Sequence, residues 1–216
     1  MAERGRSPLL VASLAAGLLY PLAWRLALPA AASIALKGLG VGLLALLAAT
    51  RARSRDGWML AAVMAFGALG DVLLDIRFEA GVAAFAVGHL VAIGLYWRNR
   101  RAAPTPSQIG VAAALPLFGV AMPFLLLGGG GAQFVGLTVY SLLLTLMASL
   151  AWLSRFPRYR TGVGALLFVL SDTLIAARMG PLADRAWIGY AVWFTYYAGQ
   201  LLIFLGVSST QSDDRR

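Results

Sequence analysis

Six polar or ionisable side chains lie inside long apolar stretches of the sequence. They are Lys37, Asp71, Asp75, His89, Asp172 and Gln200. An Asp or Lys at the middle of a membrane helix costs roughly 2.5–3.5 kcal/mol on insertion scales, so each is expected to have a partner or a function. The chain has no cysteine and a single histidine, which excludes thiol chemistry, disulfides and Cys-ligated metals. The carboxyl groups are therefore the first candidates for chemistry.

Two of these carboxyl groups occupy equivalent positions of an internal repeat. The repeat aligns LGDVLLDIR (69–77) with LSDTLIAAR (170–178), and FAVGHLVAIGL (85–95) with YYAGQLLIFLG (196–206). It superimposes Asp71 on Asp172, and His89 on Gln200. Chance similarity between apolar segments is the alternative, but the shared Asp–Arg spacing favours a duplication.

A pseudo-symmetry axis would bring Asp71 and Asp172 face to face across one cavity. Two carboxyl groups in a low-dielectric cavity do not both ionise cheaply, so we expect one to keep its proton while the other is anionic. An acid and a base of the same residue type is the usual arrangement for acid-assisted hydrolysis through an oxocarbenium-like state. The alternative is an Asp–Lys or Asp–Arg pair that only fixes helix packing.

Neighbouring polar side chains could steady the anionic carboxylate. Lys37 could do so by charge, and tyrosine, His89 or Gln200 by hydrogen bonds. Asp75 lies one turn from Asp71 on the same helix face, and could instead be solvated beside Arg77. The histidine and the tyrosines could equally serve only in helix packing or interfacial anchoring.

Membrane helices must position these residues, because 60% of the chain is hydrophobic, 12% is charged and the mean hydropathy is +0.79. Eight segments are long enough to span a bilayer: about 8–27, 29–50, 58–75, 80–97, 108–127, 131–153, 161–178 and 186–206. We predict an all-α, multi-pass protein of the cell or inner membrane. Residues 1–206 form a single transmembrane domain, followed by a polar, disordered tail over 207–216. Four-helix halves, about 8–103 and 104–206, are related by a pseudo-two-fold axis along the membrane normal.

The net charge of +9 follows the predicted topology. Thirteen arginines fall on one face: Arg4, Arg6, Arg51, Arg53, Arg55, Arg98, Arg100, Arg101, Arg155, Arg158, Arg160, Arg215 and Arg216. Only four fall on the other: Arg25, Arg77, Arg178 and Arg185. This alternation obeys the positive-inside rule, so both termini are predicted to be cytoplasmic and no nucleic acid is expected as a partner. It also favours a retained first helix over a cleaved signal peptide.

Several motifs resemble the YhhN-type lysoplasmalogenase family of eight-helix membrane proteins. They are GD at 70–71, AFAVGH at 84–89, GALLFVLSDTLIA at 164–176 and TYYAGQLLI at 195–203. The segment that contains Lys37 is similar to the family's lysine-bearing second helix. Two positions depart from the family pattern, which often has Tyr at position 92 and Pro at position 38; this chain has Ala92 and Gly38.

This resemblance implies hydrolysis of the vinyl ether bond of lysoplasmalogens to a fatty aldehyde and a glycerophospho-alcohol. Asp71 and Asp172 would act jointly: a protonated Asp protonates the β-carbon, and an anionic Asp stabilises the oxocarbenium and orients water. The expected substrate-binding residues are Lys37, Asp75, His89, Tyr140, Ser171, Tyr196, Tyr197 and Gln200. Lys37 would hold the anionic carboxylate or the lipid phosphate. The chemistry needs no metal or organic cofactor, and the expected partner is a lysophospholipid that enters from the bilayer, among other membrane lipids.

Two other classes of protein fit the same residues. A proton-coupled transporter of a small or lipid-like substrate also uses intramembrane carboxylates and repeated halves. It predicts access from both faces of the membrane and no bond cleavage. A non-catalytic scaffold predicts that Asp71 and Asp172 face packed neighbours without a cavity.

Overall fold

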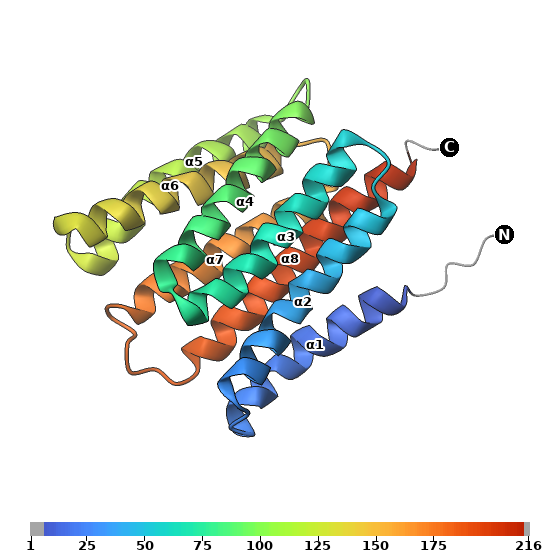
Figure 1. The fold of residues 1–216 in the computed structure, drawn as a ribbon. Helices are drawn as coiled ribbons and strands as arrows, with labels where there is room; N and C mark the ends of the chain where they lie inside the picture. Colours follow the sequence, from blue (N-terminus) through green and yellow to red (C-terminus); the bar gives the residue numbers. More distant parts are fainter. Residues whose placement is uncertain (1–6, 214–216) are drawn as a thin grey trace. The chain divides into compact units, whose positions relative to one another are not determined.

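The computed structural model describes residues 7–213, with side chains to residue 210, and these residues form helices joined by short loops (Figure 1). The helices are α1 (Pro8–Arg25), α2 (Ala30–Arg51), α3 (Arg55–Ile76), α4 (Phe78–Arg98), α5 (Pro106–Leu127), α6 (Gly131–Leu153), the π-helical turn η1 (Arg158–Gly162), α7 (Val163–Arg178) and α8 (Ile188–Asp213). Counting η1 and α7 as one span, eight helices of the described chain are long and apolar enough to cross a membrane. The predicted all-α, multi-pass integral membrane protein is confirmed.

The chain divides into two compact units within α4. The first unit ends at Gly88 and the second begins at His89. In the first unit, α1, α2 and α3 lie side by side (Figure 1). The buried Ser13 of α1 donates a hydrogen bond of 2.5 Å to the carbonyl of Gly40 in α2. A Cβ at Gly38 of α2 would lie 2.7 Å from Val72 Cγ2 of α3, so small residues set the spacing of these helices.

The second unit contains the end of α4, the paired helices α5 and α6, and the paired helices α7 and α8. The backbones of α7 and α8 approach closely at two glycines. A Cβ at Gly164 would lie 2.7 Å from the Gly199 carbonyl oxygen, and a Cβ at Gly199 would lie 2.7 Å from that of Gly164. Such contact is possible only where both positions lack a side chain.

The helix pairs of the internal repeat pack alike at one point. In the first unit, a Cβ at Gly88 of α4 would lie 3.2 Å from Phe66 Cβ of α3. In the second unit, a Cβ at Gly199 of α8 would lie 3.5 Å from Leu167 Cβ of α7. The repeat superimposes Gly88 on Gly199 and, when extended towards the N-terminus, Phe66 on Leu167. This equivalence accords with a duplication, while the two four-helix halves and their axis stay a prediction.

Two arginine-rich loops are tied together at one end of the second unit. The α4–α5 loop and the α6–α7 loop form an antiparallel bridge between Arg100 and Ser154. The Arg101 backbone N–H donates to the Leu153 carbonyl at 3.0 Å. We call residues 98–101 and 154–160 the basic corner. Its two loops share one end of this unit, in keeping with the predicted topology.

Helix α8 continues beyond the predicted end of the last span at residue 206. It runs to Asp213, so the expectation of a disordered tail is wrong for residues 207–213. Val207 is fully buried and anchors the extension, and the Ser209 hydroxyl donates to the Gly206 carbonyl at 2.8 Å. Four arginines of the predicted cytoplasmic face lie outside the described residues: Arg4, Arg6, Arg215 and Arg216.

Candidate active site

Asp172 is joined to a tyrosine of the neighbouring helix in the second unit. Asp172 lies in α7, and its side chain is half-buried. The Tyr140 hydroxyl of α6 donates a hydrogen bond of 2.7 Å to Asp172 Oδ2. A hydroxyl at this distance can stabilise a carboxylate by donating a hydrogen bond to it, or can accept a hydrogen bond from the carboxylic acid.

His89 extends this contact into a chain of three groups. Its Nε2 lies 3.2 Å from the Tyr140 hydroxyl, and its ring packs edge-on to Phe168 with centroids 5.0 Å apart. His89 is buried. A neutral or cationic histidine can donate to the tyrosine, and the other neutral tautomer can accept from it. The arrangement can therefore pass a proton between Asp172 and His89 through Tyr140.

Phe168 also links His89 to the aromatic residues of α8. Its ring packs edge-on to Tyr196 with centroids 5.2 Å apart, and Gln200 Nε2 donates to the Tyr196 hydroxyl at 3.3 Å. Gln200 is 2% exposed, and its Oε1 has no hydrogen-bond partner within the part of the chain that the structure describes. A buried amide oxygen without a donor can accept a hydrogen bond from a ligand.

Two further predicted residues have structural partners on α8. Tyr197 is buried and stacks on Trp193, with centroids 6.0 Å apart. The Ser171 hydroxyl donates to the Val192 carbonyl at 3.1 Å and holds α7 against α8.

The first unit holds the other predicted carboxylates. Asp71 of α3 is 2% exposed, next to Gly70, where a Cβ would lie 2.6 Å from the Phe85 ring. Lys37 Nζ of α2 lies 2.8 Å from Asp75 Oδ1. Asp75 is therefore ion-paired across two helices and not simply solvated beside Arg77, and the carboxylate held by Lys37 is that of Asp75.

The residues thus form two groups, one in each unit. Asp71, Asp75 and Lys37 belong to the first unit, and the Asp172 group to the second, so the pairing of Asp71 with Asp172 stays a prediction. Among the side chains of residues 7–210, no three of His, Asp or Glu gather where they could hold a metal ion.

Phe168 was missed as a site residue. It lies four positions before Asp172 and therefore on the same helix face, which is the signal that could have revealed it. Trp193, the stacking partner of Tyr197, was not predicted as a site residue either.

Comparisons with known proteins identify a family for this arrangement. The sequence model of the YhhN family matches residues 32–207. The chain is 32% identical over 157 residues to a lysoplasmalogenase of Mycobacterium bovis. The aligned region covers 69% of this chain and 59% of that protein. The chain is also 38% identical over 159 residues to lysoplasmalogenase TMEM86B of Sus scrofa. This aligned region covers 66% of this chain and 60% of that protein.

The chain thus spans about 60% of the length of the curated relatives that it matches. The search of solved structures gave no significant match. The family match covers seven of the eight spans of the described chain, except for the opening residues of α2 and the last residues of α8; it does not include α1. This protein belongs to the YhhN family.

Proposed function

We propose that this protein is a membrane hydrolase that cleaves the vinyl ether bond of lysoplasmalogens. The products are a fatty aldehyde and a glycerophospho-alcohol. The observation that carries the proposal is the match to the YhhN family over residues 32–207, together with relatives named lysoplasmalogenase at 32–38% identity. Buried or half-buried Asp71 and Asp172 supply the acid–base groups that such a reaction needs.

In the proposed reaction, one carboxylic acid of the Asp71–Asp172 pair transfers its proton to the β-carbon of the vinyl ether. The double-bond electrons form the new C–H bond, and the adjacent carbon becomes an oxocarbenium. The other carboxylate stabilises this cation and orients a water molecule that attacks it. The attacking water returns one proton to the carboxylate pair, and the hemiacetal then collapses to aldehyde and alcohol. One proton is given and one is recovered, so the pair is ready for the next turnover.

Tyr140 and His89 serve Asp172 in this proposal as positioning residues. The hydrogen bonds of 2.7 Å and 3.2 Å connect Asp172 to His89 through one hydroxyl. When Asp172 is anionic, His89 donates to Tyr140 and Tyr140 donates to Asp172. When Asp172 is protonated, Asp172 donates to the Tyr140 hydroxyl, and Tyr140 donates to His89 Nε2. This relay accommodates both charge states that Asp172 passes through in one catalytic cycle.

The substrate is proposed to contact the polar residues beside this relay. Gln200 Oε1 lacks a donor from the described residues, so it is suited to accept a hydrogen bond from the glycerol hydroxyl of a lysophospholipid. Tyr196 and Tyr197 line the same stretch of α8. In the first unit, Lys37 is proposed to exchange its ion pair with Asp75 for contact with the lipid phosphate.

The test is aldehyde release from a purified ethanolamine lysoplasmalogen by the full chain reconstituted in lipid nanodiscs. The corresponding 1-acyl lysophospholipid, which has no vinyl ether, is the substrate control. We expect aldehyde from the lysoplasmalogen only. A folded protein that releases none would overturn the proposal. In that case, uptake of the intact lipid into proteoliposomes would favour a transporter.

A further inference from the structure

The junction between α6 and η1, inside the basic corner, brings an indole and a guanidinium together. Arg158 Cζ lies 5.6 Å from the centre of the Trp152 ring, in a cation–π contact. Gly162 makes room for this pair, because a Cβ there would lie 2.7 Å from Trp152 Cε3 and 3.3 Å from Arg158 Cγ. The ring and the guanidinium are therefore held against each other by the turn of η1.

Both side chains have a buried N–H group that lacks an acceptor. Trp152 Nε1 and Arg158 Nε are buried, and neither has a hydrogen-bond partner among the residues described here. Indole and guanidinium nitrogens only donate hydrogen bonds. Buried donors without acceptors are destabilising and are rare in native proteins. The pair therefore lacks a group that accepts hydrogen bonds.

The surroundings favour an acceptor that is negatively charged. Six arginines lie in the two loops and at their helix ends: Arg98, Arg100, Arg101, Arg155, Arg158 and Arg160. The sequence contains no Asp or Glu from residue 80 to residue 171. Arg101 Nε donates to the Ser154 carbonyl at 2.9 Å, and Arg155 Nε to Asn99 Oδ1 at 2.7 Å. These bonds join the two loops, and so many guanidinium groups in one place favour an anionic ligand.

Exposed aromatic residues in and next to the basic corner indicate the source of the anion. Tyr159 is 80% exposed and Trp97 is 57% exposed. Aromatic residues at the ends of membrane helices sit at the level of the lipid headgroups. Basic sites between membrane helices at this level bind phospholipid headgroups, and arginine binds phosphate oxygens in a bidentate manner.

We propose that Trp152 and Arg158 bind the phosphate of an anionic glycerophospholipid from the adjacent leaflet. The phosphate oxygens accept hydrogen bonds from the indole and the guanidinium, and the remaining arginines of the basic corner attract the lipid. Arg158 precedes Asp172 by 14 residues on a continuous span, or about 21 Å of helix. The site is thus separate from the Asp172 group and does not depend on the proposed hydrolase activity.

The test uses the full chain in mild detergent micelles, with thermal unfolding and native mass spectrometry as readouts. Phosphatidylglycerol is added in one arm, phosphatidylcholine in the second and inorganic phosphate in the third. The variants are Arg158→Gln and Trp152→Phe. The second keeps an aromatic ring and the charge of Arg158 while it removes the indole N–H, so it stays informative if Arg158→Gln fails to fold.

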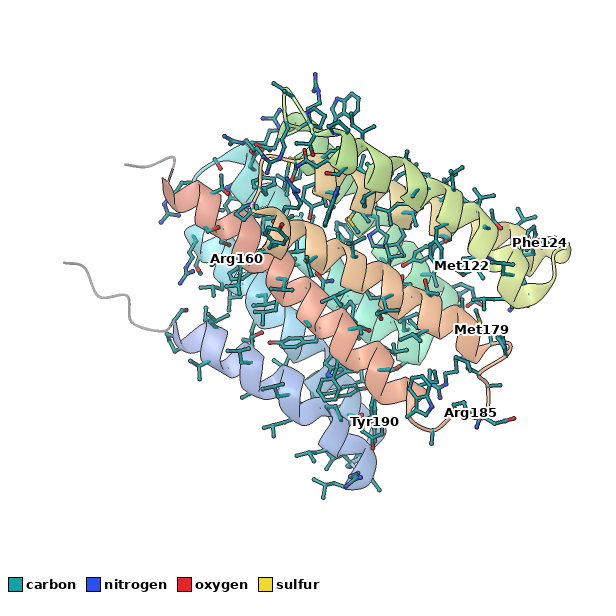
Figure 2. All side chains as sticks on the ribbon, turned by 180° about the vertical axis from the view of Figure 1, so that it is seen from behind. Met122, Phe124, Arg160, Met179, Arg185 and Tyr190 are labelled. Carbon is teal, nitrogen blue, oxygen red and sulfur yellow. The ribbon has the colours of Figure 1, made fainter. Side chains whose placement is uncertain are left out.

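Matched controls carry the same substitutions at the other end of the second unit. They are Arg185→Gln and Trp187→Phe, both exposed. Figure 2 shows Arg185 beside Met179, at the opposite end of this unit from Arg160.

We expect phosphatidylglycerol to raise the Tm of the wild type by roughly 3 °C or more over phosphatidylcholine, with retained phosphatidylglycerol in the mass spectrum. Trp152→Phe and Arg158→Gln should lose at least half of this shift, and both controls should keep it. An equal shift in all variants would mean general electrostatic attraction and would overturn the proposal. The proposal would also be overturned if inorganic phosphate raised the Tm as much as phosphatidylglycerol does, or if phosphatidylglycerol did not raise the Tm.

Discussion

Tyr140 donates a hydrogen bond of 2.7 Å to Asp172, although the two residues lie 32 positions apart on different helices. The same hydroxyl lies 3.2 Å from His89 Nε2 on a third helix. A single phenol thus connects α4, α6 and α7 within the second unit. The predictions below begin with this contact.

Replacing Tyr140 with Phe removes the hydroxyl and keeps the ring. If the relay serves the reaction, kcat for aldehyde release should fall by about 100-fold, with KM little changed. The loss of a donor to Asp172 should also cost roughly 1–3 kcal/mol of stability. A role in packing alone would lower Tm and leave the pH–rate profile unchanged, so a folded Tyr140→Phe protein with wild-type kcat and pH profile would refute the relay.

Asp71→Asn and Asp172→Asn preserve side-chain size and remove the acid–base function. Each should reduce aldehyde release by about 100-fold or more, because acid or base catalysis by one group contributes on this scale. Asp184→Asn, in the exposed loop before α8, is the matched control and should retain activity. Full activity in either Asp71→Asn or Asp172→Asn would remove that residue from the catalytic pair.

The ion pair between Lys37 and Asp75 should couple α2 to α3. Lys37→Met or Asp75→Leu alone should lower stability by about 1–2 kcal/mol, because each leaves one charge without its partner in a partly exposed site. The double variant should be less destabilised than the sum of the single variants. Thermal unfolding in nanodiscs measures this coupling, and strictly additive effects would show that the two charges do not interact.

Gly199→Ala should separate α7 from α8. The new Cβ would lie 2.7 Å from the Gly164 carbonyl, and backbone cannot give way as a flexible side chain can, so we expect a loss of about 1–3 kcal/mol. Gly110→Ala in α5 is the control, because a Cβ there meets nothing within 4 Å. Alanine favours helix over glycine, so the control should be neutral or stabilising. A Gly199→Ala protein as stable as the control would contradict the close approach.

The spans could be predicted from sequence because membrane helices follow from the lengths of apolar segments. The span over 131–153 was predicted with the bounds that α6 has. The end of α8 could not be predicted in this way, because its last turns are polar and depend on burial of Val207 and on local hydrogen bonds at Gly206.

The contacts of the site were harder to predict than its members. The polar residues inside the membrane were identified as unusual, and several do meet. Which residue meets which depends on the rotation and register of separate helices, and periodicity within one helix does not contain that information. Lys37, for example, was predicted to hold the anionic carboxylate of the Asp71–Asp172 pair or the lipid phosphate, whereas in the structure it pairs with Asp75.

The contact between Gly164 and Gly199 also restricts how a lipid can reach the protein interior. Their backbones are too close to admit even a methyl group, and Gly199 is the residue before Gln200. The seam between α7 and α8 is therefore closed to an aliphatic chain at the depth of Gln200. At this depth a lateral gate for a lipid tail must lie along a different helix boundary, so a cross-link between α7 and α8 beside Gly199 should leave entry of the proposed lipid substrate unimpeded.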